Sequence, residues 1–313
     1  MSSNSTHYVA PTNTETVMVD QVRLSEKKSN LWIDAWRDLR RRPTFWVSVV
    51  LCAVIIVMAV VPTLFTSVGP SGAACDLSNS NGDASAGHPL GYNFLGCDIW
   101  SRLVHGTRTS MLVGVMATLI STVIGVIMGA LAGFYGGFLD SLLSRVGDIF
   151  FTIPYIIAAV VVMSVLADYR NEFVLALAIG GFSWASTARI ARAEVLRVKQ
   201  ADYVTASISI GLSRFRTMIT HVLPNAMAPV IVVTTLSLGT AIVAESTLSF
   251  LGVGLGGSTV SWGADISQAQ TQIRTAPLAL FWPSLALTVT VLAFITLGEL
   301  LRDAVDPKSR AQR

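Results

Sequence analysis

Six stretches with almost no charged residues constrain this chain more than any other feature. They cover residues 45–65, 111–133, 149–166, 173–188, 226–250 and 279–300. A helix of about 20 apolar residues crosses the hydrocarbon core of a bilayer, and lipid offers the backbone no partner outside a helix or a closed barrel. Only 13% of the residues are charged, against about 25% in soluble domains. The sequence therefore predicts an all-α, polytopic membrane protein with six transmembrane helices.

The distribution of Lys and Arg indicates the orientation of these helices, because loops rich in cations tend to stay in the cytoplasm. With both termini in the cytoplasm, 18 of the 22 Lys and Arg residues fall on the cytoplasmic side. The four on the outside are Arg102, Arg108, Arg170 and Arg274. We therefore expect cytoplasmic N and C termini, and we attribute the net charge of +3 to topology rather than to nucleic-acid binding.

The chain is predicted to have two parts, a region of residues 1–43 and a membrane domain of residues 44–313. The first is a polar cytoplasmic tail followed by an elbow helix at the membrane interface, with Trp32, Ala35, Trp36 and Leu39 on one face and Pro43 at its end. Tryptophans on this face and arginines elsewhere on the helix suit a position at headgroup depth. The alternative is that this segment simply begins the first span.

The longest external loop, residues 67–109, contains Cys75 and Cys97. An exported loop faces an oxidising compartment, so a disulfide between them would close a loop of about 20 residues and add roughly 3 kcal/mol of stability. The alternative is two unrelated thiols, because spacing alone does not show that the backbones approach. No recognised metal-ligand spacing links the polar residues of this loop, His88, Cys97, Asp98 and His105, and we expect no metal site.

Glycines recur every four residues at the end of the second span, at Gly125, Gly129, Gly133 and Gly137. Residues four apart share a helical face, so the pattern predicts a ridge without side chains where another helix packs closely. The neighbour is either a helix of this chain or one of a partner subunit.

The cytoplasmic loop of residues 189–224 is a polar interruption between two apolar spans. We expect a short helix over 202–210, a left-handed cap at Gly211 and a second helix that starts at the N-cap Ser213. This second helix is expected to break at Leu223–Pro224. The first helix is rich in small residues, which suits insertion into a groove on another protein; they are Thr205, Ala206, Ser207 and Ser209.

This loop resembles that of the integral membrane permeases of ATP-binding-cassette (ABC) importers. The family pattern is Glu-Ala-Ala, three residues, Gly, nine residues, Ile, any residue, Leu-Pro, and it falls here on Thr205, Ala206, Ser207, Gly211, His221, Leu223 and Pro224. The spacing fits throughout. Three positions depart from the pattern, Thr205 for Glu, Ser207 for Ala and His221 for Ile, and the first puts a salt bridge from the leading Glu in doubt.

Further segments narrow the resemblance to the C-type permease subunit of dipeptide and oligopeptide importers, a group that includes peptide/nickel systems. They include HPLGYNFLGCDIWSRLVHGTRTSMLVGV from His88, AESTLSFLGVGL from Ala244 and LGELLRDAVDP near the end. The likeness covers nearly everything from about Trp32 to Pro307. The implied fold is that of a type I ABC importer permease.

The resemblance implies a passive half of a translocation pathway in a prokaryotic cytoplasmic (inner) membrane. The expected partners are a homologous second permease subunit, two ATP-binding subunits, an extracytoplasmic solute-binding protein, membrane lipid and the peptide substrate. ATP and Mg are expected on the partner chains, with no cofactor on this one. The chain also lacks a GxxxxGK[ST] phosphate loop. The residues implied to couple the chain to the ATPases are Asp202, Thr205, Ala206, Ser207, Gly211, Leu223 and Pro224.

Polar groups near the membrane are candidates for the pathway, because a charge in hydrocarbon is costly. Glu245 is the strongest, and three roles are open to it: facing the pathway, forming an outer gate with Ser246 and Ser249, or pairing with a cation. The alternative is an interfacial carboxylate that reaches water. Arg189 and Arg192 are candidates for contact with an ATPase, although their cytoplasmic placement already accounts for them.

The two other classes of function are an enzyme and an ion-coupled secondary transporter. An enzyme is not supported, because the chain has neither HExxH nor GxSxG. An ion-coupled secondary transporter would carry ionisable residues at mid-membrane or paired repeats, and neither is found. The cargo itself is not fixed by the sequence, and a nickel chelate or another small solute is the alternative to a peptide.

Overall fold

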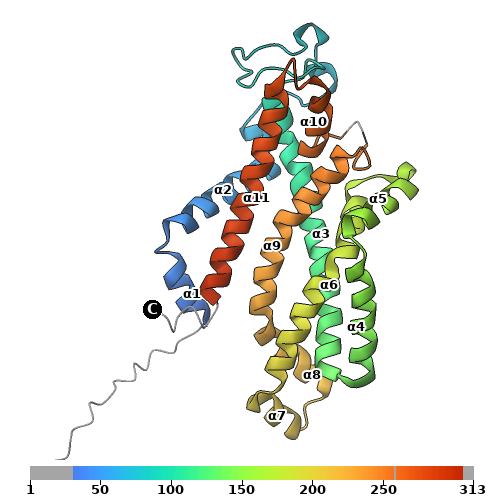
Figure 1. The fold of residues 1–313 in the computed structure, drawn as a ribbon. Coiled ribbons are helices and arrows are strands. Elements are labelled where there is room, and N and C mark those ends of the chain that lie inside the picture. The colour runs from blue at the N-terminus through green and yellow to red at the C-terminus, as the bar shows by residue number, and fades with distance from the viewer. Residues whose placement is uncertain (1–30, 257–258, 306–313) are drawn as a thin grey trace, which may run out of the picture.

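The computed structural model describes residues 31–256 and 259–305, and this part of the chain is built from helices (Figure 1). In chain order they are α1 (Leu31–Leu39), α2 (Pro43–Val60), α3 (Ile99–Tyr135), α4 (Gly137–Thr152), α5 (Tyr155–Val165), α6 (Glu172–Lys199), α7 (Asp202–Ser209), α8 (Arg214–Thr217), α9 (Leu223–Phe250), α10 (Trp262–Ala269) and α11 (Pro277–Val305). Within the described residues, five continuous helical segments are long and apolar enough to cross a membrane: α2, α3, α6, α11 and the run Arg214–Phe250 that includes α8 and α9.

The third predicted span is two helices rather than one. Only together are α4 and α5 long and apolar enough to cross a membrane. The pair is bent by 80° at the break between them. Ile153 is extended and Pro154 precedes the first residue of α5, because proline removes a backbone donor and disfavours helical geometry in the residue before it. The apolar window 149–166 thus covers the end of α4 and all of α5.

The centre of the molecule is the contact between α3 and α6, which run in the same direction. A Cβ added at Gly125 would lie 2.7 Å from the Cβ of Thr187, and one at Gly133 would lie 2.9 Å from the carbonyl oxygen of Arg192. The glycine ridge therefore packs against α6, a helix of this chain, and not against a partner subunit. Gly137 does not continue the ridge, since α3 ends at Tyr135 and a Cβ on Gly137 would meet nothing within 4 Å.

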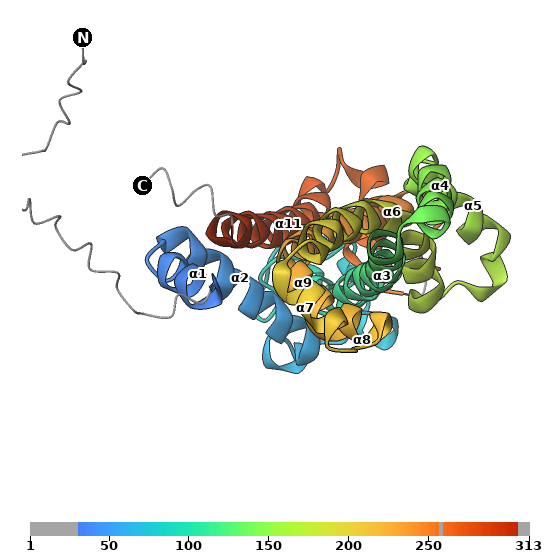
Figure 2. The same ribbon diagram turned by 90° about the horizontal axis from the view of Figure 1, so that it is seen from below.

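The two ends of the described chain lie together. Ala35 and Leu39 of α1 are buried in a cluster with Leu300 and Ala304 of α11, and Figure 2 shows α1 at one side of the molecule with α4 and α5 at the other. Pro43 is the first residue of α2 rather than the end of the elbow helix, a position where the missing donor costs nothing. The first 30 residues of the predicted cytoplasmic tail lie outside the described residues.

The segment between α2 and α3 forms a compact cap at the end of the molecule opposite α7 (Figure 1). A disulfide joins Cys75 to Cys97, with 4.2 Å between their Cα atoms. The indole of Trp100 donates to the carbonyl of Phe65 (3.0 Å) and ties the cap to α3. α3 begins at Ile99, so the predicted external loop 67–109 ends in helix.

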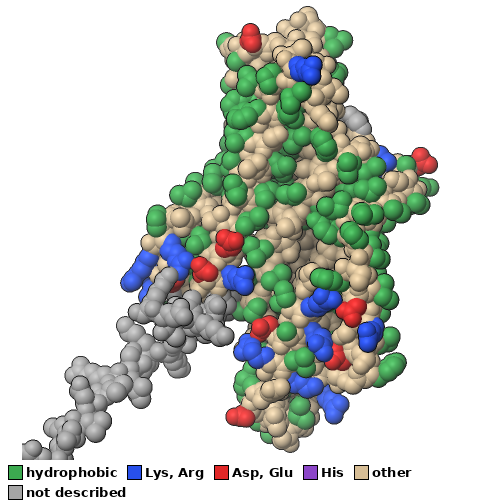
Figure 3. Space-filling model, viewed as in Figure 1, with side chains coloured by type: hydrophobic (Ala, Val, Ile, Leu, Met, Phe, Trp, Pro, Cys, Tyr) green, Lys and Arg blue, Asp and Glu red, His purple; other side chains and the backbone are tan. Residues whose placement is uncertain are grey.

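Charged side chains are unevenly distributed over the surface. Figure 3 shows Lys and Arg gathered around the end that holds α1, α7 and α8, while hydrophobic side chains cover the part above it. The exposed apolar residues of the long helices include Val50 on α2, Leu119 and Val123 on α3 and Leu292 on α11. In a protein that crosses a bilayer, lipid covers such residues.

Candidate functional site

The polar interruption of the sequence folds into an arm, residues 201–222, which joins α6 to α9. Its first helix, α7, buries Val204 and Ser207. Val204 belongs to a cluster with Phe134 of α3, Val198 of α6 and Val222 near the start of α9. This packing fixes the arm to the ends of three long helices, so that a push on the arm acts on all of them.

The turn between α7 and α8 has the geometry that the sequence predicts. Gly211 has φ +95°, a conformation that side-chain-bearing residues rarely adopt. Its N–H donates to the carbonyl of Ile208 (3.0 Å), and that of Leu212 donates to the carbonyl of Ser207 (3.1 Å). Ser213 caps the next helix, since its hydroxyl accepts from the N–H of Arg216 (3.3 Å).

The predicted break at Leu223–Pro224 is wrong. Met218–Val222 forms a π-helical turn, and α9 follows it directly from Leu223. Proline at the second position of α9 cannot donate to a carbonyl of the preceding turn, and the wider π-helical turn absorbs this mismatch without ending the helix. The arm is therefore continuous with α9.

The exposed surface of the arm combines large apolar side chains with charged ones, among them Arg214 and Arg216. Ile210 is 78% exposed and Phe215 is 61% exposed. The other exposed apolar residues of the arm are Tyr203, Ile208 and Ile219. Several large apolar side chains exposed within one short segment are a candidate contact surface, and the sequence reasoning assigned docking to the small side chains instead.

The predicted coupling residues fall on both sides of the arm. Asp202, Thr205, Ala206, Gly211 and Pro224 are exposed, and Leu223 is partly buried. Ser207 faces inward instead, where its hydroxyl donates to the carbonyl of Val204 (2.7 Å). The groove-insertion hypothesis thus fits Thr205 and Ala206 but not Ser207.

The two arginines considered as ATPase contacts are both engaged within the chain. Arg189 donates to Asp148 (2.8 Å), and Arg192 donates to Asp140 through two bonds, one of 2.7 Å. These pairs join α6 to α4.

Glu245 lies inside the protein, with 0% of its surface exposed. Its carboxylate accepts from Ser110 of α3 (2.9 Å), from Ser249 (2.9 Å) and from Ser246 (3.2 Å). Ser110 also accepts from the backbone N–H of Trp262 on α10 (3.4 Å). The alternative, an interfacial carboxylate that reaches water, is wrong. The carboxylate is buried, and its hydrogen bonds come from serine hydroxyls instead of water. The cluster joins α3, α9 and α10, and a gate at Glu245 stays a prediction.

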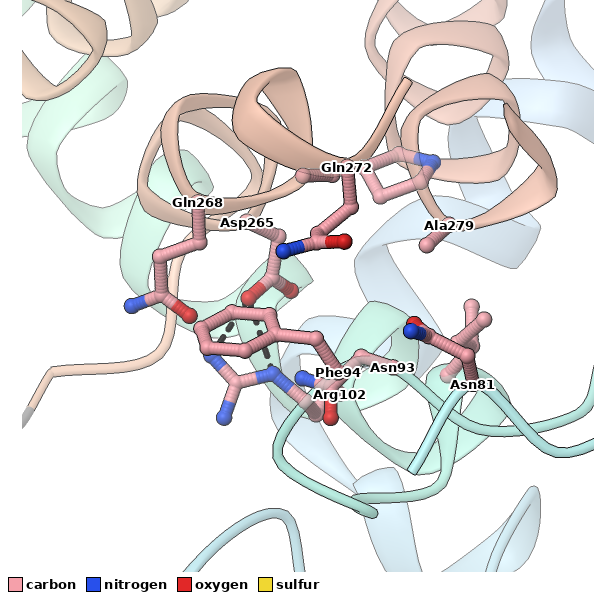
Figure 4. Close-up of a pocket in the computed structure, with 11 residues that line it drawn as sticks. Asn81, Asn93, Phe94, Arg102, Asp265, Gln268, Gln272 and Ala279 are labelled. Carbon is pink, nitrogen blue, oxygen red and sulfur yellow. Dashed lines mark hydrogen bonds and ion pairs between the residues drawn. The ribbon is translucent and has the colours of Figure 1, made fainter. Parts of the chain in front are cut away.

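A second buried polar contact lies nearer the cap (Figure 4). The guanidinium of Arg102 on α3 binds Asp265 on α10 through two bonds, one of 2.8 Å from Nε, and it also donates to the carbonyl of Pro70 (3.1 Å). Burial raises the pKa of the Asp265 carboxyl, whereas Arg102 lowers it by its charge and by hydrogen bonding. The pair adjoins a cavity of about 20 Å³, and Arg102 also lines one of about 520 Å³ toward the cap.

The comparisons with known proteins agree with this architecture. Residues 121–311 match the family model of the binding-protein-dependent transport system inner membrane component, and residues 30–82 match the N-terminal TM domain of oligopeptide transport permease C. The chain therefore belongs to the family of inner membrane components of binding-protein-dependent transport systems. These proteins are permeases of ABC transporters, and the chain is an integral membrane protein of that class.

Two relatives match over nearly the whole chain. The oligopeptide transport system permease protein OppC of Bacillus subtilis is 35% identical over 93% of this chain and 94% of its own length. The glutathione transport system permease protein GsiD of Shigella flexneri is 37% identical over 93% of each chain. Among solved structures, the MetNI methionine ABC transporter in inward-facing conformations matches with a TM-score of 0.48 and 21% identity, over 67% of this chain and 96% of that one.

Proposed function

We propose that this chain is the permease subunit of an ATP-driven importer for di- or oligopeptides. It forms half of the translocation pathway, together with a homologous second permease, and two separate ATPase subunits drive it. A solute-binding protein delivers the peptide from outside. The chain itself carries out no chemical reaction. ATP and Mg bind to the partner ATPase subunits.

The observation that carries this proposal is the arm. Its inner face is packed against α3, α6 and α9, and its outer face presents Tyr203, Ile210 and Phe215 to solvent. A surface of this kind suits a groove on a partner protein, because aromatic and aliphatic anchors contribute most to binding when they fill a pocket. The arm lies at the cation-rich end (Figure 3), which the positive-inside rule places in the cytoplasm, where ATP is available.

The peptide cargo is supported by the two relatives. They are named for oligopeptide and glutathione transport, and both cargoes are peptides. The cavity at the break of the third span, described below, is neutral and suits the same class of solute.

The test is to replace Phe215 by Ala in the assembled transporter and to measure ATP hydrolysis and peptide uptake in the same vesicles. We expect the truncation of an exposed anchor to lower ATP-dependent uptake at least several-fold while membrane insertion stays normal. Phe281→Ala is the matched control, since Phe281 is 50% exposed on α11, away from the arm.

Two results would contradict the proposal. One is unchanged uptake and ATP hydrolysis in the Phe215 variant. The other is peptide uptake by the wild-type complex that survives inactivation of the ATPases, which would favour an ion-coupled secondary transporter.

A further inference from the structure

A cavity of about 300 Å³ lies beside the break between α4 and α5. Its walls come from α3, α4, α5, α6 and α9, and the break supplies Ile153 and Pro154. This volume is at the lower end of the range for ligand pockets, about 300–1,000 Å³. The break between α4 and α5 is therefore part of the cavity wall.

The lining combines hydroxyl groups with aromatic rings and contains no charged residue. The hydroxyls belong to Thr118, Ser121, Tyr155, Ser183, Ser186, Ser237 and Thr240, and the rings to Tyr155, Phe150, Phe151 and Phe182. The neighbouring cavity toward the arm differs, because Asp148, Arg189 and Arg192 line it.

Among the hydroxyls of this cavity, that of Thr118 is buried and has no partner. Thr118 is 5% exposed, and its buried hydroxyl makes no hydrogen bond within the described structure. Other hydroxyls of the lining bond to their own helix, as Ser237 does to the carbonyl of Val233 (2.8 Å) and Thr240 to that of Ser237 (2.9 Å). A buried polar group without a partner is costly and rare, so the Thr118 hydroxyl keeps an unused hydrogen bond at the wall of the cavity.

We propose that this cavity contacts the peptide during passage and binds its backbone through neutral hydroxyl groups. The inference rests on the proposed function and adds the place and chemistry of substrate contact. A hydroxyl both donates and accepts, so the same groups serve the N–H and the C=O of any peptide. Since the lining carries no charge, it imposes no preference for a charged side chain, and the rings accommodate apolar ones.

This placement differs from the gate predicted at Glu245. The carboxylate of Glu245 is already bonded to Ser110, Ser246 and Ser249, whereas the hydroxyl of Thr118 is without a partner. A group that binds and releases a solute needs a hydrogen-bond donor or acceptor that is not already bonded within the protein.

The first experiment labels a single cysteine in the cavity. Ser183→Cys introduces a thiol at a partly buried lining position, while Cys52 is buried and Cys75 and Cys97 are bonded to each other. In the assembled transporter with its binding protein and ATP, we expect tri-alanine to slow modification by a methanethiosulfonate reagent at least three-fold. Ser164→Cys is the control, since Ser164 is exposed on α5 outside the cavity, and we expect no protection there.

The second experiment removes the unpartnered hydroxyl. Thr118→Val preserves the shape of the side chain, so we expect the tri-alanine concentration for half-maximal uptake to rise about ten-fold. Thr235→Val is the matched control, because the hydroxyl of Thr235 bonds only to the carbonyl of Ile231 (3.0 Å) and lines no wall of this cavity.

The outcomes separate the two proposals. Uptake of tri-alanine by the wild-type complex with no protection of the cavity thiol would overturn the cavity assignment alone, as would equal effects of both valine variants. Slowing by added lipid rather than by peptide would assign the cavity to an acyl chain and would also overturn it. Absence of ATP-dependent peptide uptake in the wild type would overturn the proposed function and, with it, this inference.

Discussion

At the scale of single residues, the polar side chains inside the helices fall into two kinds. Glu245 is 0% exposed and has three hydroxyl donors, whereas Thr118 is 5% exposed and its hydroxyl has no partner. Burial of a carboxylate is tolerated only where hydrogen bonds replace those of water. The first kind therefore stabilises the fold, and the second is available for a ligand.

Replacing Glu245 by Ala is expected to lower the free energy of unfolding by about 2–4 kcal/mol, because it leaves a cavity and strips three serine hydroxyls of their acceptor. Thermal unfolding of the purified protein in detergent measures this loss. Ser110→Ala, which removes one hydrogen bond, should cost about 1 kcal/mol.

Glu299→Gln is the control for a carboxylate of the same type, since Glu299 is exposed on α11, and it should leave the unfolding temperature unchanged. Equal stability of the Glu245→Ala and Glu299→Gln variants would show that the buried cluster does not hold α3, α9 and α10 together.

At the scale of elements, the approach of α3 to α6 depends on missing side chains. Gly125, Gly129 and Gly133 on α3 lie against α6, and Gly180 on α6 lies against the carbonyl of Ala117. Close packing of this kind associates helices in lipid, where the hydrophobic effect does not drive them together.

Gly129→Ala is therefore expected to destabilise the protein by about 1–3 kcal/mol, the usual cost of overpacking. The added Cβ would lie 2.8 Å from that of Ala191 and still closer to the carbonyl oxygen of Ala188. Gly181→Ala is the matched control in the partner helix, where a Cβ meets nothing within 4 Å, and alanine there should be neutral or slightly stabilising. Detergent unfolding curves of the two variants compare them directly, and equal curves would contradict the packing argument.

Local chemistry made several elements predictable from the sequence. Gly211 and Ser213 predict the turn of the arm, because a left-handed cap and an N-cap depend on residues close in the chain. Pro154 and Pro224 look alike in sequence, yet one accompanies an 80° bend and the other enters a continuous helix. The packing around each proline decides the difference, and no local pattern contains it.

The same limit applies to the candidate site. Ser207 has the size that a docking helix favours, but the surrounding helices turn it inward. The hydroxyls of the cavity come from segments far apart in the chain, and each one alone is an ordinary polar residue of a span. Only the fold brings them together.

At the scale of the whole molecule, two ends of different character are separated by an apolar body. The cap with its disulfide forms one end, and the arm with the surrounding cations forms the other (Figures 1 and 3). We infer that the cap faces the exterior and the arm faces the cytoplasm, because loops rich in Lys and Arg are retained inside.

This orientation predicts the labelling of two exposed positions. Ser78→Cys in the cap should react with a membrane-impermeant maleimide added to intact cells, whereas Thr205→Cys in the arm should react only after permeabilisation. Both positions are exposed, and the native thiols are buried or bonded to each other. The opposite pattern would invert the topology and remove the arm from the compartment that holds ATP.

The continuity of the arm with α9 has a mechanical consequence. The run Arg214–Phe250 is one rod of 37 residues, about 55 Å long at the rise of an α-helix, and it has no free joint at Pro224. Near its far end, the hydrogen bond from Ser110 to Glu245 joins this rod to α3, so the rod can pivot about that point. We expect a partner that tips the near end to swing Ser237 and Thr240, which lie between the two points, and so to reshape the hydroxyl-lined cavity with each stroke.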